Sequence, residues 1–324
     1  MAVRATRSAS GSSGDGSRCL LLALSHDELG VIFDGLADPF QPVMAVALSS
    51  TCEGLRTPLH AALQVLQQRR GKGKALCHKV NRDKHLRKGQ AETIFADLPR
   101  TEHLNWYSTD LTAEDMATLA MLMHWMPKLE SLSLTKNGFS DAGAKSLFGG
   151  MCRDAAPSLT ILSLYNNKVG FRGAEALASA LRKGALPKLE QLFMGRNPIG
   201  VEGTGALTVP LRKRPALKLM DLTRCGLGDE GTAALVDNLG KDDFKGLTHL
   251  DLERNALTDV GCKMLVDTLR TGALPALVSV FDVDMAEVLS EQASEAALEA
   301  VEGALEPRRR FGEAPRPESW GGVL

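Results

Sequence analysis

The most regular feature of the chain is an alternation of apolar and polar residues that recurs through residues 101–283. In the clearest copies, two apolar residues separated by one residue are followed by an asparagine three positions later, and then by a further apolar residue. The first of the paired positions recurs at intervals of 30, 30, 28, 30 and 30 residues, at Leu132, Leu162, Leu192, Met220, Leu250 and Val280. A fixed period of this length predicts an array of stacked structural repeats.

Each copy predicts a strand, a turn and a helix. Leu132 and Leu134 alternate, and therefore lie on one buried face of a short strand. The asparagine that follows should turn inward, where its amide satisfies backbone groups at the bend. Stacked copies would form a ladder of Asn137, Asn167, Asn197 and Asn255, with Cys225 in the place of one asparagine. Helical spacing, as at Ala174, Leu177 and Leu181, fills the rest of the repeat.

These copies resemble leucine-rich repeats. Five full copies are present, and a degenerate one with Leu104, Trp106, Thr109 and Leu111 precedes them. The period and the helix in each unit are similar to the ribonuclease-inhibitor-like subclass. This resemblance implies an α/β solenoid shaped as a horseshoe, with a parallel sheet inside and helices outside. No unit can bury its apolar face alone, so the array depends on contacts between neighbours.

A second pattern occupies residues 19–68. Ile32, Phe33 and Leu36 continue from Leu29 at helical spacing, after Ser25, which can cap the helix. The segment resembles an F-box, the three-helix module that docks a substrate receptor onto the Skp-type adaptor of a cullin–RING ubiquitin ligase. The resemblance implies that the adaptor-binding residues are Leu24, Leu29, Ile32, Phe33, Leu36 and Leu48.

The same segment has a simpler interpretation as an N-terminal cap of the repeats. A solenoid needs an element that covers its first apolar edge, and an amphipathic stripe can belong to such a core. The order of the two F-box-like elements, directly ahead of leucine-rich repeats, favours the F-box.

The remaining segments differ in composition. We expect residues 1–18 to be a disordered N-terminus, 69–100 a basic linker, 284–306 a C-terminal capping helix, and 307–324 a disordered tail.

Charge and cysteine usage restrict the compartment and the partners. The net charge of −1 gives no overall attraction to nucleic acid, and we expect no nucleic-acid function. The six cysteines form no CxxC pair or disulfide framework, which favours a cytoplasmic or nuclear location. No apolar run approaches the length of a membrane span.

The sequence contains no recognisable catalytic, cofactor-binding or metal-binding motif. A phosphate-binding loop, a nucleophile motif and HExxH are all missing. Cys77, His78 and His85 lack a fourth ligand and the spacing of known zinc sites. We therefore expect a protein that is not an enzyme and needs no cofactor.

The informative surface is the inner face of the predicted sheet. Residues beside the buried leucines point into the concavity, and six strands about 4.8 Å apart give a face of protein-epitope size. We expect exposed Tyr165 and Phe193 to be apolar anchors, with neighbouring charges at the rim. The predicted partner-binding residues are Tyr107, Tyr165, Phe193, Arg196, Asp221, Arg224, Asp251, Glu253 and Arg254.

Together these features predict a protein-interaction module. The leading hypothesis, from the resemblance, is the substrate receptor of a Skp-cullin-F-box-type ubiquitin ligase. One alternative is a stand-alone scaffold or sensor whose N-terminus is only a cap. Another is a GTPase regulator similar to the Ran GTPase-activating proteins, which use the same repeat subclass.

Overall fold

The computed structural model divides the chain into two compact units, residues 1–70 and 71–324. It describes residues 25, 28–29, 31–33, 37–50, 53–82, 92–151, 153, 155–237, 239–240, 242–280 and 293–309. The predicted disordered N-terminus, most of the predicted tail, Leu24 and Leu36 lie outside the described residues. The boundary between the units falls within helix α3 (Glu53–Arg82).

The first unit has a small helical core. Ser25 and Glu28 form a capping box, in which the Ser25 backbone N–H donates to Glu28 Oε2 (2.8 Å) and the Glu28 N–H donates to Ser25 Oγ (3.3 Å). These hydrogen bonds hold the pKa of Glu28 below its ordinary value. Helix α2 (Val43–Ser50) follows, and the N-terminal part of α3 completes the unit. The core residues are Leu29, Phe33, Ala37, Ala45, Leu59 and Leu66.

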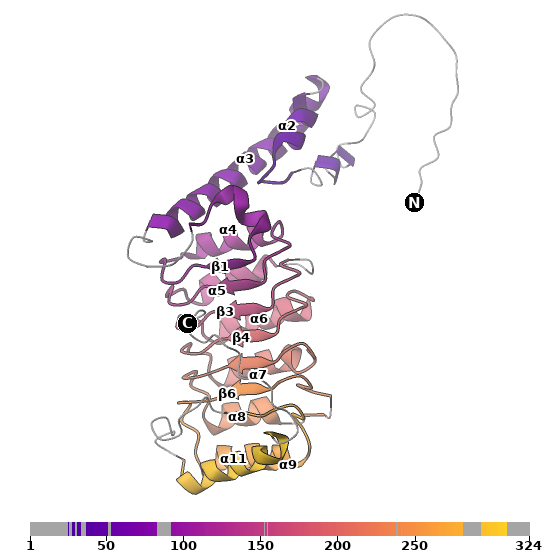
Figure 1. Cartoon of the computed structure of the whole chain (residues 1–324). Helices are drawn as coiled ribbons and strands as arrows, with labels where there is room; N and C mark the ends of the chain where they lie inside the picture. The colour runs from indigo at the N-terminus through magenta and orange to yellow at the C-terminus, as the bar shows by residue number, and fades with distance from the viewer. Residues whose placement is uncertain are drawn as a thin grey trace, which may run out of the picture. The chain divides into compact units, whose positions relative to one another are not determined.

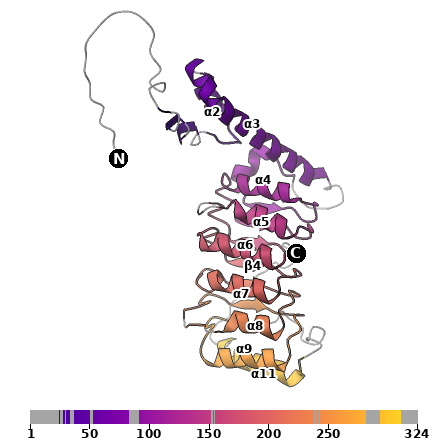
Figure 2. The ribbon, with the colours of Figure 1, turned by 180° about the vertical axis from the view of Figure 1, so that it is seen from behind.

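The second unit is the predicted α/β solenoid. Its six strands form one parallel sheet in sequence order. They are β1 (His103–Asn105), β2 (Ser131–Ser133), β3 (Ile161–Ser163), β4 (Gln191–Phe193), β5 (Leu219–Asp221) and β6 (His249–Asp251). The helices are α4 (Ala113–Met123), α5 (Asp141–Gly149), α6 (Phe171–Arg182), α7 (Gly200–Leu211), α8 (Gly228–Val236) and α9 (Asp259–Arg270). Strands lie along one side of the array and helices along the other (Figures 1 and 2).

The register of the sheet confirms the repeat period. Leu104, Leu132, Leu162, Leu192, Met220 and Leu250 are successive partners across the six strands. Ser279 adds an isolated parallel bridge to His249, so the copy around Val280 continues the sheet by a single pair. Each helix packs on the next, as expected if the apolar core is shared by neighbours.

The predicted asparagine ladder is also confirmed. Asn167 Nδ2 donates to the carbonyls of Leu134 (3.0 Å) and Leu164 (2.8 Å), and its Oδ1 accepts from the N–H of Asn137 (2.9 Å). Each asparagine thereby joins its own turn to that of the preceding repeat. At the substituted position Cys225 Sγ donates to Met194 O (3.4 Å), a weaker bond that leaves a gap in the ladder.

The expectation of a basic linker over residues 69–100 is wrong for residues 69–82 and 95–100, which are helical. The last turns of α3 and the 3₁₀ helix η3 (Phe95–Arg100) cover the first edge of the repeats. Asn81 exchanges two hydrogen bonds with the Thr93 backbone, and Thr93 Oγ1 accepts from the Trp106 indole (3.2 Å). The apolar side chains that carry this packing are Leu76, Cys77, Val80, Phe95 and Leu98. The basic residues alternate with these apolar positions, so the helix is amphipathic.

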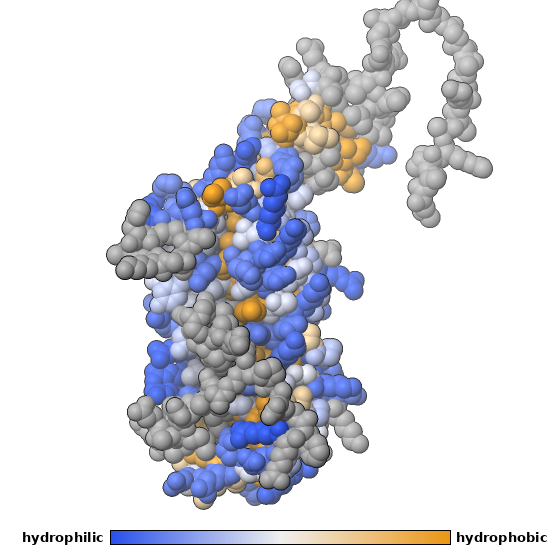
Figure 3. All heavy atoms as spheres, in the orientation of Figure 1, coloured by the Kyte–Doolittle hydropathy of each residue, from blue (hydrophilic) through white to orange (hydrophobic). Residues whose placement is uncertain are grey.

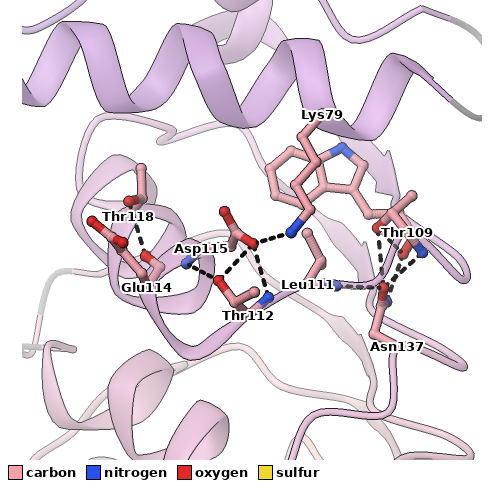
Figure 4. Close-up of polar contacts among 9 residues, drawn as sticks. Lys79, Thr109, Leu111, Thr112, Glu114, Asp115, Thr118 and Asn137 are labelled. Carbon is pink, nitrogen blue, oxygen red and sulfur yellow. Dashed lines mark hydrogen bonds and ion pairs between the residues drawn. The ribbon is translucent and has the colours of Figure 1, made fainter.

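One lysine of this segment forms a partly buried ion pair (Figure 4). Lys79 Nζ lies 2.5 Å from Asp115 Oδ2, and Asp115 also closes the capping box of α4 with Thr112. Burial would raise the pKa of Asp115, but hydrogen bonds from Lys79 and Thr112 outweigh it, and the pKa is lowered. The pair links the covering helix to the first repeat.

The other end of the array is covered by α11 (Glu295–Arg309), with Leu298, Val301 and Leu305 buried. We expected this helix over 284–306; residues 281–292 lie outside the described residues, and the helix continues three residues beyond the expected end. Arg308 explains the extension, because its guanidinium donates to the carbonyls of Leu269, Ala273 and Leu274 at the end of α9. The first residues of the expected tail are thus part of the cap.

Candidate partner-binding surfaces

The inner face of the sheet brings most of the predicted partner-binding residues together. Phe193 is the register partner of Ser163 and Asp221, and Asp221 is that of Asp251. Gly195 has no side chain, so Asp221 and Tyr165 can lie close to it. A Cβ at Gly195 would lie 2.6 Å from Asp221 Oδ2 and 2.9 Å from Tyr165 Cε2, so a larger residue there would force both apart.

The expectation that Phe193 is an exposed anchor is wrong. Its side chain is 3% exposed, whereas Tyr165 is partly exposed. Phe193 lies in the middle of the sheet, where side chains of both adjacent strands flank it. Asp221 and Asp251 are buried as well, and neither is a rim charge. Whether these residues contact a partner stays a prediction.

The two buried carboxyl groups form an acidic row. Asp221 Oδ1 accepts from the Thr223 N–H (2.8 Å), and Asp251 Oδ1 accepts from the Glu253 N–H (2.9 Å). Burial raises the pKa of Asp251 to about 7, and the neighbouring charges of Asp221 and Glu253 add to the effect. Asp251 therefore gains or loses its proton near neutral pH.

Two aromatic side chains lie beneath cations. The guanidinium carbon of Arg196 is 5.7 Å from the centre of the Tyr165 ring, and Lys136 Nζ is 5.1 Å from that of Tyr107. Lys136 also donates to the Tyr107 hydroxyl (2.7 Å). Burial raises the pKa of Tyr165 above its ordinary value, so this phenol stays protonated at neutral pH. Tyr107 and Tyr165, both predicted partner-binding residues, thus each make a cation–π contact with a basic residue in the next repeat.

The turn that ends each strand has a left-handed backbone. The residue before the ladder position has a φ of 56° at Arg196, 53° at Arg224 and 55° at Arg254. All three arginine side chains are exposed. Non-glycine residues adopt this conformation at some cost, and asparagine tolerates it best. Asn166 occupies the equivalent position one repeat earlier, with a φ of 55°.

A second surface lies on the first unit. Helix α2 is apolar on several sides, and Val43 (72%) and Met44 (61%) are exposed. Val31 is 74% exposed and Ile32 36%. Figure 3 shows hydrophobic side chains gathered at the surface over α2. Soluble proteins rarely expose several large apolar residues side by side unless a partner covers them.

The predicted adaptor-binding residues divide between core and surface. Leu29 and Phe33 are buried in the unit's own core, and Leu48 packs against it. Only Ile32 of the described set is exposed at the surface. Residues on one helical stripe face their own core first, because a small unit must bury them to fold. The exposed Val31, Val43 and Met44 were missed, although the uniformly apolar α2 sequence was a signal.

The described residues contain neither of two kinds of feature, metal-binding clusters and membrane-spanning helices. Within them, no group of three or more histidine, cysteine or acidic residues could hold a metal ion. No helix in the same part of the chain is long and apolar enough to cross a membrane. Cys77, Cys225 and Cys262 are buried. Burial raises the pKa of the Cys262 thiol to about 11, which disfavours a reactive thiolate.

Comparison with protein families identifies the repeats. A family model described as Leucine Rich repeat matches residues 126–148, 155–178 and 247–266. The chain contains leucine-rich repeats. No curated protein matches the chain. Among solved structures, "Leiomodin-1 Actin-Binding Site 2 (ABS2)" is similar over 41% of this chain and 80% of that one, at 17% identity and a TM-score of 0.34. Leucine-rich repeats generally serve as scaffolds for protein binding, so the repeats of this chain form a protein-interaction module.

Proposed function

We propose that the protein is a substrate receptor that docks onto a Skp-type adaptor through its first unit and binds a protein substrate with its repeats. The F-box-like segment carries the docking half of this hypothesis, and the repeats carry the other half. The two halves make separate predictions.

The observation that carries the proposal is the cap at the first edge of the repeats. Gly71–Arg82 of α3 and the 3₁₀ helix η3 belong to the same compact unit as the repeats and bury Leu76, Val80 and Phe95. A solenoid needs one such cover at each end. Because residues 71–100 supply it, residues 25–68 are not required for that purpose. This favours a separate role for the first unit.

The surface of the first unit supports docking. Val31, Val43 and Met44 are mostly exposed while Leu29 and Phe33 form a core beneath them. A folded unit with an apolar exterior is suited to a hydrophobic partner surface, and burial of each large side chain contributes about 1.5–3 kcal/mol. An adaptor that supplies such a surface would cover this patch.

The test uses the full chain and a purified Skp-type adaptor. We expect the wild-type chain to bind the adaptor in calorimetry, and the double variant Val43→Glu/Met44→Glu to lose at least about tenfold in affinity. Val260→Glu is the matched control, because Val260 is 61% exposed on α9 of the second unit. It should bind as the wild type does.

A wild-type chain that is folded but does not bind the adaptor would contradict the docking half. In that case a protein captured through the repeats would indicate the stand-alone scaffold. Equal losses in the double variant and in Val260→Glu would mean that the contact does not involve the α2 surface.

A further inference from the structure

Three arginines form a straight row along the turns that end strands β4, β5 and β6. Arg196, Arg224 and Arg254 occupy the same position in successive repeats. The ladder of backbone hydrogen bonds continues through these turns, because Arg196 N donates to Thr223 O (2.6 Å) and Arg224 N donates to Glu253 O (2.9 Å). The three Cα atoms are therefore about one strand spacing apart, ~4.8 Å, and the row is roughly 10 Å long.

The arginines of this row have no carboxylate partner in the part of the chain that the structure describes. Among the described residues, none of the three forms an ion pair, whereas Lys72, Lys79, Lys218 and Arg309 each do. Arg214 and Arg308 are also satisfied, by carbonyl groups at helix ends. The row is thus a set of neighbouring cations that stay exposed although acidic residues lie in the adjacent strands.

The backbone places the three side chains in equivalent positions. All three arginines have the left-handed conformation that Ser108, Lys136 and Asn166 also adopt at this position of the other repeats. The first of them is oriented by the Tyr165 ring beneath it. Three consecutive repeats therefore place exposed positive charges side by side, which points to a negatively charged ligand.

We propose that the row of Arg196, Arg224 and Arg254 binds an acidic helix of a protein partner, with carboxylates at positions i, i+4 and i+7. Such side chains lie on one helical face about 5–6 Å apart and span about 10.5 Å, close to the spacing and length of the row. Carboxylates on an extended strand repeat at about 6.7 Å on one face and fit less well. The inference rests on the proposed function only in that the repeats bind a protein.

The neighbouring acids favour a helix over nucleic acid. The partly exposed Glu253 lies next to Arg254 in the chain, and the buried Asp221 and Asp251 end strands β5 and β6. A phosphate backbone is negative along its whole length, so the partly exposed Glu253 would repel it while the arginines attract it. A helix carries carboxylates on one face and can turn uncharged or basic residues toward the acids.

The experiment measures fluorescence anisotropy of a labelled alanine-rich helical peptide with Glu at i, i+4, i+7 and i+11, added to the full chain. The control peptide has Gln at those positions. The test variant is Arg196→Gln/Arg224→Gln/Arg254→Gln. Its matched control, Arg172→Gln/Arg182→Gln/Arg270→Gln, removes the same charge from exposed arginines of α6 and α9.

We expect the wild type to bind the Glu peptide and not the Gln peptide, and binding to weaken as salt rises from about 50 to 300 mM. The row variant should lose at least about tenfold in affinity, and the control variant less than about twofold. Equal losses in the two variants, binding of the Gln peptide, or no binding of either peptide would overturn the proposal. Preferential binding of single-stranded DNA by the same row would also overturn it, in favour of nucleic acid.

The same variants separate this inference from the proposed function. The row variant should bind the Skp-type adaptor as the wild type does and should keep the wild-type melting temperature. If the adaptor binds and the Glu peptide does not, only the acidic-helix inference fails. If the peptide binds and the adaptor does not, only the docking half of the proposed function fails.

Discussion

At the scale of single residues, the buried acids of the inner face couple stability to pH. The pKa of Asp251 in the folded protein is about 7, above its unfolded value of about 3.9. A carboxyl group with a raised pKa supports folding fully below its unfolded pKa, and this contribution is lost as the pH rises through the folded pKa. The group should therefore destabilise the protein progressively between about pH 4 and pH 7.

Asp251→Asn should remove this dependence. We expect the variant to be more stable than the wild type by about 1–3 kcal/mol at pH 8, with the difference vanishing near pH 4. Urea unfolding across this pH range measures the effect. Asp242→Asn, in an exposed loop, serves as the control and should show no trend. A gain for Asp251→Asn that is the same at every pH would contradict a raised pKa.

The asparagine ladder makes a second prediction for residues. Asn197 Nδ2 donates to Leu164 O and Met194 O (both 2.8 Å), and its Oδ1 accepts from Val169 N (3.0 Å). Asn197→Ala would leave these buried groups without partners, so we expect a loss of about 2–4 kcal/mol. Cys225→Ala removes only weak sulfur contacts one repeat later and should cost about 1 kcal/mol. Chemical denaturation of both variants gives the comparison, and similar losses would mean that the ladder contributes little.

Single-residue exposure was the least predictable property. The alternation of apolar residues identified which side of the strand Phe193 occupies, but not how closely its neighbours pack around it. The close approach of Tyr165 and Asp221 over Gly195 depends on three strands at once. Raised pKa values have the same origin, because burial and neighbouring charge belong to the assembled sheet.

At the scale of elements, Gly71 and Gly73 of α3 have opposite environments. Gly73 faces η3, and a Cβ there would lie 2.3 Å from Phe95 Cε2. A Cβ at Gly71 would have nothing within 4 Å. The packing of α3 on η3 therefore requires a glycine at position 73 but not at position 71.

The two glycines provide a matched test of the N-terminal cap. Gly71→Ala should stabilise the chain by about 0.5–1 kcal/mol, because alanine is the better helix former. Gly73→Ala gains the same propensity but displaces the Phe95 ring, so we expect a net loss of about 1–3 kcal/mol. Thermal melting of the full chain measures both. A stabilising Gly73→Ala would show that α3 and η3 are not tightly packed.

The repeat elements were predictable and the N-terminal cap was not. Leucines at a fixed period indicate where the strands and helices lie, because every repeat buries the same set of apolar positions against its neighbours. The cap occurs once and has no internal copy for comparison. Its many basic residues are typical of a solvated linker, although Leu76, Cys77 and Val80 have the spacing of a buried helical stripe.

At the scale of the whole molecule, the repeats should lose structure together. Leu192 lies in the core between Leu162 and Met220 of the adjacent strands. Leu192→Asp places a charge in this shared core, so we expect a fall in melting temperature together with loss of amide protection in β3 and β5 as well as β4. Hydrogen exchange measures each strand.

Gln191→Asp is the control, because it introduces the same carboxylate at a neighbouring, partly exposed position of β4. It should leave protection in the adjacent strands unchanged. Loss of protection confined to β4 in the Leu192 variant would mean that the repeats are energetically independent.

The guanidinium of Arg308 has a counterpart inside the array. Arg214 donates to the carbonyls of Leu181, Ala185 and Leu186, as Arg308 does to those of Leu269, Ala273 and Leu274. Both arginines donate hydrogen bonds to a turn of the same sequence, Gly-Ala-Leu-Pro, which begins at Gly184 and again at Gly272. The terminal helix thus recognises a site that the chain also presents three strands earlier. In a shortened chain in which residues 293–309 follow the earlier turn, Arg308 would find the same carbonyl acceptors there. Whole repeats between the two turns could therefore be gained or lost while the same helix still covers the last repeat.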